Sequence, residues 1–565
     1  SLTELVAKNV IAGNWLWWNM AIGGMLTVFF FARLWRRAGI MTDIEFIELR
    51  YSGKAASFLR GFKAIYLGFF MNIIVMGWVN KAMEKIFFIT LPGADPFILT
   101  CIIALLVAIY ASVSGLLGSA RTDSFQFIFA LTGCIILAVI VIKIPEIGSI
   151  KNLKQNLPEN IFSFFPSIRT SQNNGNSSGL LSLSIGAFIA FIGVQWWSSW
   201  YPGADPGGGG YIAQRMMSAK NEKHSLLATL WFNIAHYTLR PWPWIIVALA
   251  GLMLLPRAKS IDELKNENPE YYSKAKIIFE NKSINNIDNK LKANKDFMAF
   301  YEKYENTVDP GLIYPKLMLN YLPKGLFGLL IAVFIAAYMS TIASQLNWGT
   351  SYLIHDFYRR FIKKDKSEKH YVAVSRILIY ILIITSLLVT KYFLTTISGA
   401  WEFILNASAG LGLVLILRWY WWRINAWSEI IAMISPLVIY PFSVKVLGLQ
   451  SPLTLFPIAF GTTLIWIAGT YLTKPVNTEI LLEFYIRVHP GGIGWKKIAV
   501  LVPEVKADSG FLRLIICWLC GIVAIYATLY GTGKIILSEF FKGCVALAIA
   551  ATSGSIIYII NRKKT

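Results

Sequence analysis

Long apolar runs recur along the whole chain, and short basic segments separate them. Five stretches contain no Asp, Glu, Lys or Arg, namely 96–120, 178–204, 325–355, 446–473 and 514–533. An apolar run of about 20 residues is long enough to cross a bilayer as a helix. When runs with one or two charges are included, the pattern predicts thirteen spans, near 14–35, 58–87, 96–118, 123–145, 179–201, 225–255, 325–355, 372–395, 400–421, 428–448, 452–472, 513–531 and 535–560. The chain is therefore predicted to be an all-α, polytopic membrane protein.

The composition agrees with a membrane protein and excludes other classes. Hydrophobic residues make up 56% of the chain and charged residues only 15%, against about 25% charged in soluble domains. The net charge of +22 comes from Lys and Arg that lie between the apolar runs and form no single face, so nucleic acid is excluded as a partner. Cys517 and Cys520 form a CxxC within an apolar run with no histidine nearby, and we interpret them as small buried hydrophobic residues. Without an HExxH or GxSxG motif, the chain is predicted not to be an enzyme and to need no cofactor.

The basic segments predict which side of the membrane each loop occupies. Loops rich in Lys and Arg stay in the cytoplasm. When thirteen spans are threaded, the basic residues of the short loops and the tail all fall on one side, which leaves the first residue outside: Arg33, Arg36, Arg37, Arg50, Lys54, Arg60, Lys63, Arg121, Arg215, Lys220, Lys223, Arg359, Arg360, Lys363, Lys364, Lys366, Lys369, Arg562, Lys563 and Lys564. The long segment 256–324 then lies outside, and segment 474–510 is a cytoplasmic connector.

Two polar features within the spans are costly in a membrane and therefore informative. The segment 200–210, WYPGADPGGGG, follows a charge-free span and cannot continue a helix. It predicts either a broken helix whose freed backbone groups face a solute or a flexible loop. Arg240 lies in the middle of a span, and His236 precedes it by one turn on the same face. We expect Arg240 to face a polar cavity or to contact a carboxylate, with a structural ion pair as the alternative.

A third feature is a cluster of oxygen-bearing groups on one helix. Ala337, Ser340 and Thr341 are spaced i, i+3, i+4 in IAVFIAAYMSTIASQLNWGTSYLIHDFY, so one carbonyl and two hydroxyls share a face. Such a face can supply three oxygens to a sodium ion. The alternative is that the hydroxyls bond back to carbonyls of their own helix.

Four motifs, in order along residues 12 to 450, resemble those of the sodium/solute symporter family, which includes bacterial galactose and proline carriers. They are MTDIEFIELRY, YASVSGLLGSARTDSFQFIF, IAQRMMSAKNEKH and AAYMSTIASQLNWGTSYLIHDFYRR. The resemblance implies a LeuT-type fold, in which two inverted five-helix repeats enclose a site at mid-membrane. It also implies a sodium site, with sodium the only metal ion expected, at Ala337, Ser340, Thr341 and Asp123, and solute contacts at Asn19, Asn72, Trp200, Tyr201, His236, Arg240 and Asn406.

The chain departs from the family's pattern in two places. The GADPGGGG segment is several residues longer than in the sugar carriers, and Asn233 or His236 lies where those carriers have a lysine. The start, SLTELVAKNVIAGNW, resembles the outer end of core helix 1 running into helix 2. This predicts that the family's first two helices are missing and that the chain as given does not transport.

The sequence thus predicts a sodium-coupled symporter that moves a small polar solute across the bacterial inner membrane. Residues 1–450 would form the transporter core and 451–565 additional C-terminal helices. A proton-coupled carrier of the same fold and a transporter-like membrane sensor are the alternatives. Whether the solute is a sugar, an amino acid or a carboxylate stays open.

Overall fold

The computed structural model describes residues 2–166, 183–200, 207–280, 293–394, 397–505, 507–508 and 510–562, apart from the side chains of 114–121 and 398. Every regular element in these residues is a helix. Eleven helices are long and apolar enough to cross a membrane. The other two predicted spans differ from simple helices: one is the bent pair Gly399–Ala407 and Leu411–Tyr420, which meet at 47°, and the other is the shorter helix Ile185–Ser198. The all-α polytopic class is confirmed, and the count of thirteen spans is approximate.

The first two long spans are each assembled from several helical pieces. The chain begins with α1 (Leu2–Asn9) and a short turn, η1 (Ile11–Asn14). The first span then consists of α2 (Trp15–Trp18), α3 (Met20–Leu26), the π-helical turn η2 (Thr27–Phe31) and α4 (Ala32–Ala38). The short helix α5 (Phe46–Arg50) leads to the second span, which consists of α6 (Gly53–Ile65), η3 (Tyr66–Met71) and α7 (Asn72–Thr90).

The helix α8 (Pro96–Lys143) contains two predicted spans. It begins where Asp95 accepts hydrogen bonds from the backbone N–H groups of Phe97 and Ile98, as expected of an N-cap residue before a proline. The hydroxyls of Tyr110 and Thr122 lie 3.0 Å apart. Residues twelve positions apart are separated by about 18 Å along a straight helix. The two halves of α8 therefore cannot share one straight axis, in agreement with two spans.

The middle of the chain alternates membrane helices with a helical layer outside the membrane. Two small elements, α9 (Ile150–Asn156) and η4 (Glu159–Phe162), precede the short span of α10 (Ile185–Ala190), η5 (Phe191–Gln195) and α11 (Trp196–Ser198). They are followed by α12 (Gly210–Met217), α13 (Glu222–Ile234), η6 (Ala235–Leu239) and α14 (Pro241–Leu254). The outer layer is formed by α15 (Ile261–Glu267), α16 (Pro269–Glu280) and α18 (Lys295–Val308), and η8 (Pro310–Leu312) and α19 (Ile313–Tyr321) lead back to the membrane.

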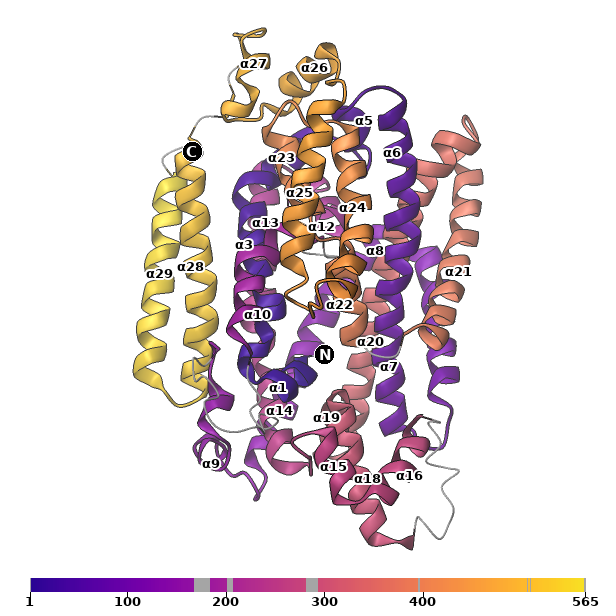
Figure 1. The fold of residues 1–565 in the computed structure, drawn as a ribbon, viewed down its shortest axis with the longest axis vertical. Coiled ribbons are helices and arrows are strands. Elements are labelled where there is room, and N and C mark those ends of the chain that lie inside the picture. The colour runs from indigo at the N-terminus through magenta and orange to yellow at the C-terminus, as the bar shows by residue number, and fades with distance from the viewer. Residues whose placement is uncertain are drawn as a thin grey trace.

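The outer layer has a small core of its own, which the sequence pattern did not indicate. Leu264, Ala275, Phe297 and Phe300 pack together between its three helices. Figure 1 shows α15, α16 and α18 at one end of the bundle, together with α9. The opposite end carries α5, α26, α27 and the C-terminus. Because the predicted cytoplasmic segments gather at that second end, the arrangement agrees with the orientation inferred from the basic loops.

The last part of the chain completes the bundle. It contains α20 (Lys324–Ser351), η9 (Tyr352–Ile362), α21 (Glu368–Tyr392), α22 (Ile397–Ala407), α23 (Leu411–Tyr420), α24 (Ala426–Lys445), α25 (Leu455–Leu472), α26 (Thr478–Val488), η10 (Ile493–Trp495), α27 (Lys496–Ala499), α28 (Phe511–Ile536) and α29 (Phe540–Arg562). The final pair, α28 and α29, lies at the side of the bundle (Figure 1). It is joined to the first span by a bond from Trp518 Nε1 to the Ile22 carbonyl (3.0 Å) and one from the Tyr526 hydroxyl to the Trp18 carbonyl (2.8 Å).

Candidate functional site

Two cavities of about 240 and 380 Å³ lie within the bundle. Both are lined by Leu2 of α1, Val79 and Ala82 of α7, Arg240 between η6 and α14, Thr341 of α20, and Ile397 of α22. Because they share these residues, the two cavities adjoin. Elements from the beginning, middle and end of the chain therefore converge on one space, which is large enough for a small solute.

Two of the four residues expected to bind sodium, Ala337 and Thr341, line this space, and the other two, Ser340 and Asp123, contact each other. The Ser340 hydroxyl donates to a carboxylate oxygen of Asp123 at 2.5 Å, across 217 positions of sequence. The Thr341 hydroxyl donates to the Ala337 carbonyl at 2.9 Å, which is the back-bonding that hydroxyls adopt in membrane helices. Ala337 and Thr341 both line the smaller cavity. Three oxygen-bearing groups thus lie within about one turn of α20, and the Asp123 carboxylate of α8 contacts that turn.

A basic residue that the sequence did not indicate for this site also contacts Asp123. Arg215 of α12 donates to the second carboxylate oxygen of Asp123 at 3.3 Å. Both side chains are partly exposed, so the ion pair itself contributes little to stability. Its importance is electrostatic, because the guanidinium and a cation bound beside Ser340 would share one carboxylate. The IAQRMMSAKNEKH motif supplies this arginine.

Arg240 and His236 are brought together at the cavities. The Arg240 Nη1 atom lies 3.3 Å from His236 Nδ1, and the imidazole stacks on Phe232, with ring centroids 5.4 Å apart. Both residues line the larger cavity, and Arg240 lines both. Among the residues that the structure describes, no carboxylate lies within ion-pairing distance of Arg240. In the described part of the protein, Arg240 therefore lines the cavities and forms no ion pair, and its role in solute binding remains a prediction.

The asparagines expected to contact solute have different surroundings. Asn72 is buried and donates to the Gln345 carbonyl at 2.9 Å, while its side-chain oxygen has no partner. Asn19 is also buried and donates to the Trp15 carbonyl at 2.7 Å, and its side-chain oxygen is likewise unpartnered. Asn406 differs because both ends of its amide are used.

In Asn406 the amide nitrogen donates to the Glu402 carbonyl at 2.8 Å, and the amide oxygen accepts from the Thr454 hydroxyl at 2.7 Å. These bonds join α22 to the start of α25, so Asn406 holds two elements together. None of these three asparagines lines the two cavities. Their assignment to solute binding remains a prediction.

The helix break after the short span Ile185–Ser198 packs against the bend between α22 and α23. Trp200 is buried and stacks on Trp348 with ring centroids 6.4 Å apart, whereas Tyr201 lies outside the described residues. The Ser198 carbonyl accepts from the Gly410 N–H at 2.8 Å, and the Trp200 carbonyl accepts from the Ser408 hydroxyl at 2.8 Å. The backbone groups freed where α11 ends are thus satisfied at the bend between α22 and α23. These two buried carbonyls thus have the partners that such groups need, and the assignment of Trp200 and Tyr201 to solute binding remains a prediction.

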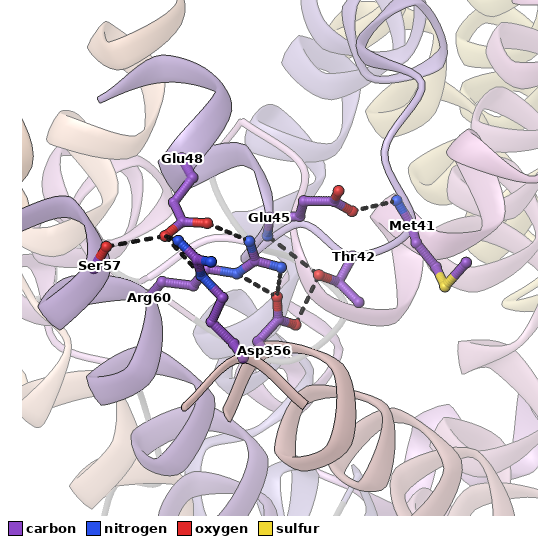
Figure 2. Close-up of polar contacts among 8 residues, drawn as sticks. Met41, Thr42, Glu45, Glu48, Ser57, Arg60 and Asp356 are labelled. Atoms are coloured by element: carbon purple, nitrogen blue, oxygen red, sulfur yellow. Dashed lines mark hydrogen bonds and ion pairs between the residues drawn. The ribbon is translucent and has the colours of Figure 1, made fainter. Parts of the chain in front are cut away.

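A network of charged residues lies at η9, the continuation of α20, at the end of the bundle that is predicted to be cytoplasmic. Figure 2 shows Arg60 between the carboxylates of Glu48 and Asp356. Arg60 lies 2.5 Å from Glu48 and 2.7 Å from Asp356. Asp356 also accepts from the Thr42 hydroxyl at 2.8 Å, and Arg360 approaches Glu48 at 3.0 Å. Burial by itself raises the pKa of Glu48, but the hydrogen bond and charge of Arg60 hold it below its ordinary value.

The same network explains part of the MTDIEFIELRY motif. Thr42 connects the segment to η9, and Glu45 accepts from the Met41 N–H at 2.9 Å (Figure 2). Phe46 is fully buried against Trp419, with ring centroids 4.4 Å apart. Each of these motif residues therefore has a structural contact, which the sequence alone did not assign.

The end of the motif reaches a second buried network. Arg50 donates to the carbonyls of Arg418, Trp421 and Trp422 at 3.0–3.1 Å, which closes the end of α23. The Tyr51 hydroxyl donates to Glu429 at 2.6 Å. Glu429 also pairs with Lys63 at 2.6 Å and with Arg418 at 3.2 Å. The motif thus joins the second span to α23 and α24.

Comparison with known proteins agrees with this architecture. The Sodium:solute symporter family model matches residues 2–255 and 303–435. The sodium/glucose cotransporter 4 of Danio rerio is 23% identical over 421 residues, which are 72% of this chain and 57% of that protein. The sodium/myo-inositol cotransporter of Bos taurus is 22% identical over 371 residues, 63% of this chain and 46% of that protein. The chain thus spans about half the length of these relatives.

A solved structure shares the fold. It is the substrate-bound, outward-open state of a Na+-coupled sialic acid symporter, with a TM-score of 0.56, 18% sequence identity, and coverage of 84% of this chain and 89% of that one. The LeuT-type architecture implied by the motifs is therefore confirmed at the level of fold. Because the family model matches well over half of its residues, the chain belongs to the sodium:solute symporter family.

Proposed function

We propose that this protein is a sodium-coupled symporter that moves a small polar solute across the bacterial inner membrane by alternating access. The observation that carries the proposal is the contact between Asp123 and Ser340, on the helical turn whose Ala337 and Thr341 line a cavity. Sodium, a hard cation, prefers oxygen ligands, as calcium and magnesium do. The Asp123 carboxylate and Ser340 hydroxyl, with the Ala337 carbonyl and Thr341 hydroxyl one turn away, offer such ligands.

The helix that carries these oxygens also offers a route for coupling. The span Lys324–Ile362 includes Ser340 and Thr341 beside the cavities and Asp356 at the cytoplasmic network. A ligand shifts a conformational equilibrium only through its differential affinity for the two states. Sodium bound to Ser340 in one state would bias the position of this helix, and Asp356 would transmit that bias to Arg60 and the 41–51 segment.

The first experiment measures whether sodium binds the purified protein. Thermal unfolding of the chain in detergent, followed by tryptophan fluorescence, is compared in sodium chloride and in choline chloride at equal ionic strength. We expect sodium to raise the melting temperature, because a ligand that binds only the folded state stabilises it. Ser340→Ala should weaken sodium binding by roughly 5- to 150-fold, the equivalent of about 1–3 kcal/mol for an unsatisfied buried polar group.

Ser375→Ala is the matched control, since Ser375 also lies in a membrane helix and donates to the Tyr371 carbonyl at 2.8 Å. It should respond to sodium as the unmodified protein does. A melting temperature that ignores sodium would contradict the proposal. If the protein instead responds to pH and not to sodium, with Asp123→Asn abolishing the response, the proton-coupled alternative is favoured.

A further inference from the structure

Arg240 presents a charged group to the two cavities without a counter-charge from the described protein. It lies within the span Glu222–Leu254, where η6 meets α14. Its recorded side-chain partner is His236 Nδ1 at 3.3 Å, and no described carboxylate lies within ion-pairing distance. A guanidinium inside the membrane is costly, and such groups mark ligand or ion pathways.

The charge of the cavity walls has one sign. The described residues that line the two cavities include Arg240, Lys85 and His236, but no Asp or Glu. The charge of Lys85 is already compensated, because its ammonium lies 2.8 Å from the Asp309 carboxylate. Within this part of the structure, Arg240 is therefore the cation available to a solute. A positively charged solute would meet no opposite charge on these walls.

The remaining walls suit a solute with an apolar body. The larger cavity is lined by aromatic side chains from several elements: Trp17, Trp78, Tyr211, Phe232, Tyr237 and Trp401. Polar groups are few. Thr341 lines both cavities, and the buried side-chain oxygen of Gln345, which lines the larger one, has no partner. In such surroundings a charge-assisted bond is stronger than in water, and guanidinium matches a carboxylate in a bidentate arrangement.

We propose that the solute is a small monocarboxylate whose carboxylate binds Arg240 and whose apolar part packs against the aromatic wall. This inference rests on the proposed function, because it takes the two cavities as the transport site. The carboxylate supplies the negative charge that the described walls lack. Thr341, expected to bind sodium, lines the same two cavities as Arg240. An anionic solute and a sodium ion would therefore lie near each other and attract.

The test compares pairs of probes that differ only in charge. Benzoate is paired with benzamide and butyrate with butyramide, and binding to the purified full chain is measured by calorimetry in sodium chloride and in choline chloride. We expect the carboxylates to bind and the amides to bind at least tenfold more weakly. Arg240→Gln should weaken carboxylate binding roughly tenfold to a hundredfold, the range for hydrogen bonds to charged groups. Arg240→Lys should retain part of the affinity, because Lys keeps the charge but loses the planar fork.

Arg376→Gln serves as the control, since Arg376 is an exposed arginine of α21 that lines neither cavity. It should bind the carboxylates as the unmodified protein does. If Arg240→Gln does not fold, the probe pairs and Arg240→Lys still decide the question. Equal affinity for carboxylate and amide, no binding of either carboxylate, or unchanged binding by Arg240→Gln would overturn the inference.

The two proposals fail in different ways. Carboxylate binding through Arg240 that is the same in sodium and in choline would uphold this inference and contradict sodium coupling. A sodium-specific stabilisation without any preference for carboxylate over amide would uphold sodium coupling and overturn this inference.

Discussion

Glu429 is the residue whose substitution should reveal most about the buried charge network that joins α6, α23 and α24. Its carboxylate is fully buried and lies 2.6 Å from Lys63, 3.2 Å from Arg418 and 2.6 Å from the Tyr51 hydroxyl. Glu429→Gln keeps the shape of the side chain but removes the negative charge. Lys63, itself only 4% exposed, then loses its counter-charge in a place where water cannot replace it.

The expected loss is large because it concerns a buried charge. Removing one partner of a buried ion pair costs about 3–5 kcal/mol, most of it from the charge left uncompensated. Unfolding in detergent, followed by tryptophan fluorescence, should therefore show Glu429→Gln to be clearly less stable than the unmodified protein. Adding Lys63→Met to this variant removes the uncompensated cation and should recover part of the loss.

A matched exposed pair provides the control. Glu368, whose side chain is 74% exposed, lies 3.1 Å from Arg359. Exposed pairs contribute about 0–1 kcal/mol, so Glu368→Gln should change stability little. The reasoning would be refuted if Glu429→Gln were as stable as Glu368→Gln, or if Lys63→Met simply added its own loss to that of Glu429→Gln.

Three further predictions concern other parts of the fold. Arg60→Gln should lower stability by about 3 kcal/mol in the same unfolding assay, because it leaves the fully buried Asp356 carboxylate without its cation; an unchanged transition would contradict the role of this pair. Gly349→Ala should lower the stability of the folded protein by about 1–3 kcal/mol, since the added Cβ would lie 2.1 Å from Asn72 Nδ2 and 2.6 Å from the Gly68 carbonyl. Gly325→Ala is the control, because its Cβ would meet nothing within 4 Å. Burial raises the pKa of Glu539, yet three lysines hold it at about 2, below its ordinary 4.5. Its stabilisation is therefore complete above pH 4.5 and lost as pH falls toward 2, and Glu539→Gln should reduce the acid-induced fall in melting temperature.

The membrane architecture was accessible from the sequence because a bilayer constrains every segment separately. Each span must be apolar over about 20 residues and must satisfy its own backbone, so each leaves a local signal. The basic loops predict the orientation from local signals for the same reason. Where spans were broken, the local signal was incomplete. Leu411–Tyr420 is bent by 47° from the preceding helix, at a glycine that the hydrophobic pattern passes over.

The layer formed by α15, α16 and α18 illustrates a second limit. Segment 256–324 is mixed in charge and was predicted only as a long outer loop, yet α15, α16 and α18 enclose a small core containing Leu264 and Phe297. Its apolar residues are widely spaced in a polar sequence. Only their meeting in three dimensions buries them.

What the sequence by itself determined is therefore the class of protein, most of its spans and the residues that are costly in a membrane. Which of those residues meet was decided by the tertiary structure. Asp123 and Ser340 are 217 positions apart, and Lys63 and Glu429 are 366 apart. Arg240 had two readings on sequence grounds, a cavity or an ion pair, and the described packing around it placed it at the cavities without a carboxylate partner. The physical reason is that polar groups in a bilayer are satisfied by neighbours in space, and one sequence cannot show which distant helix will supply them.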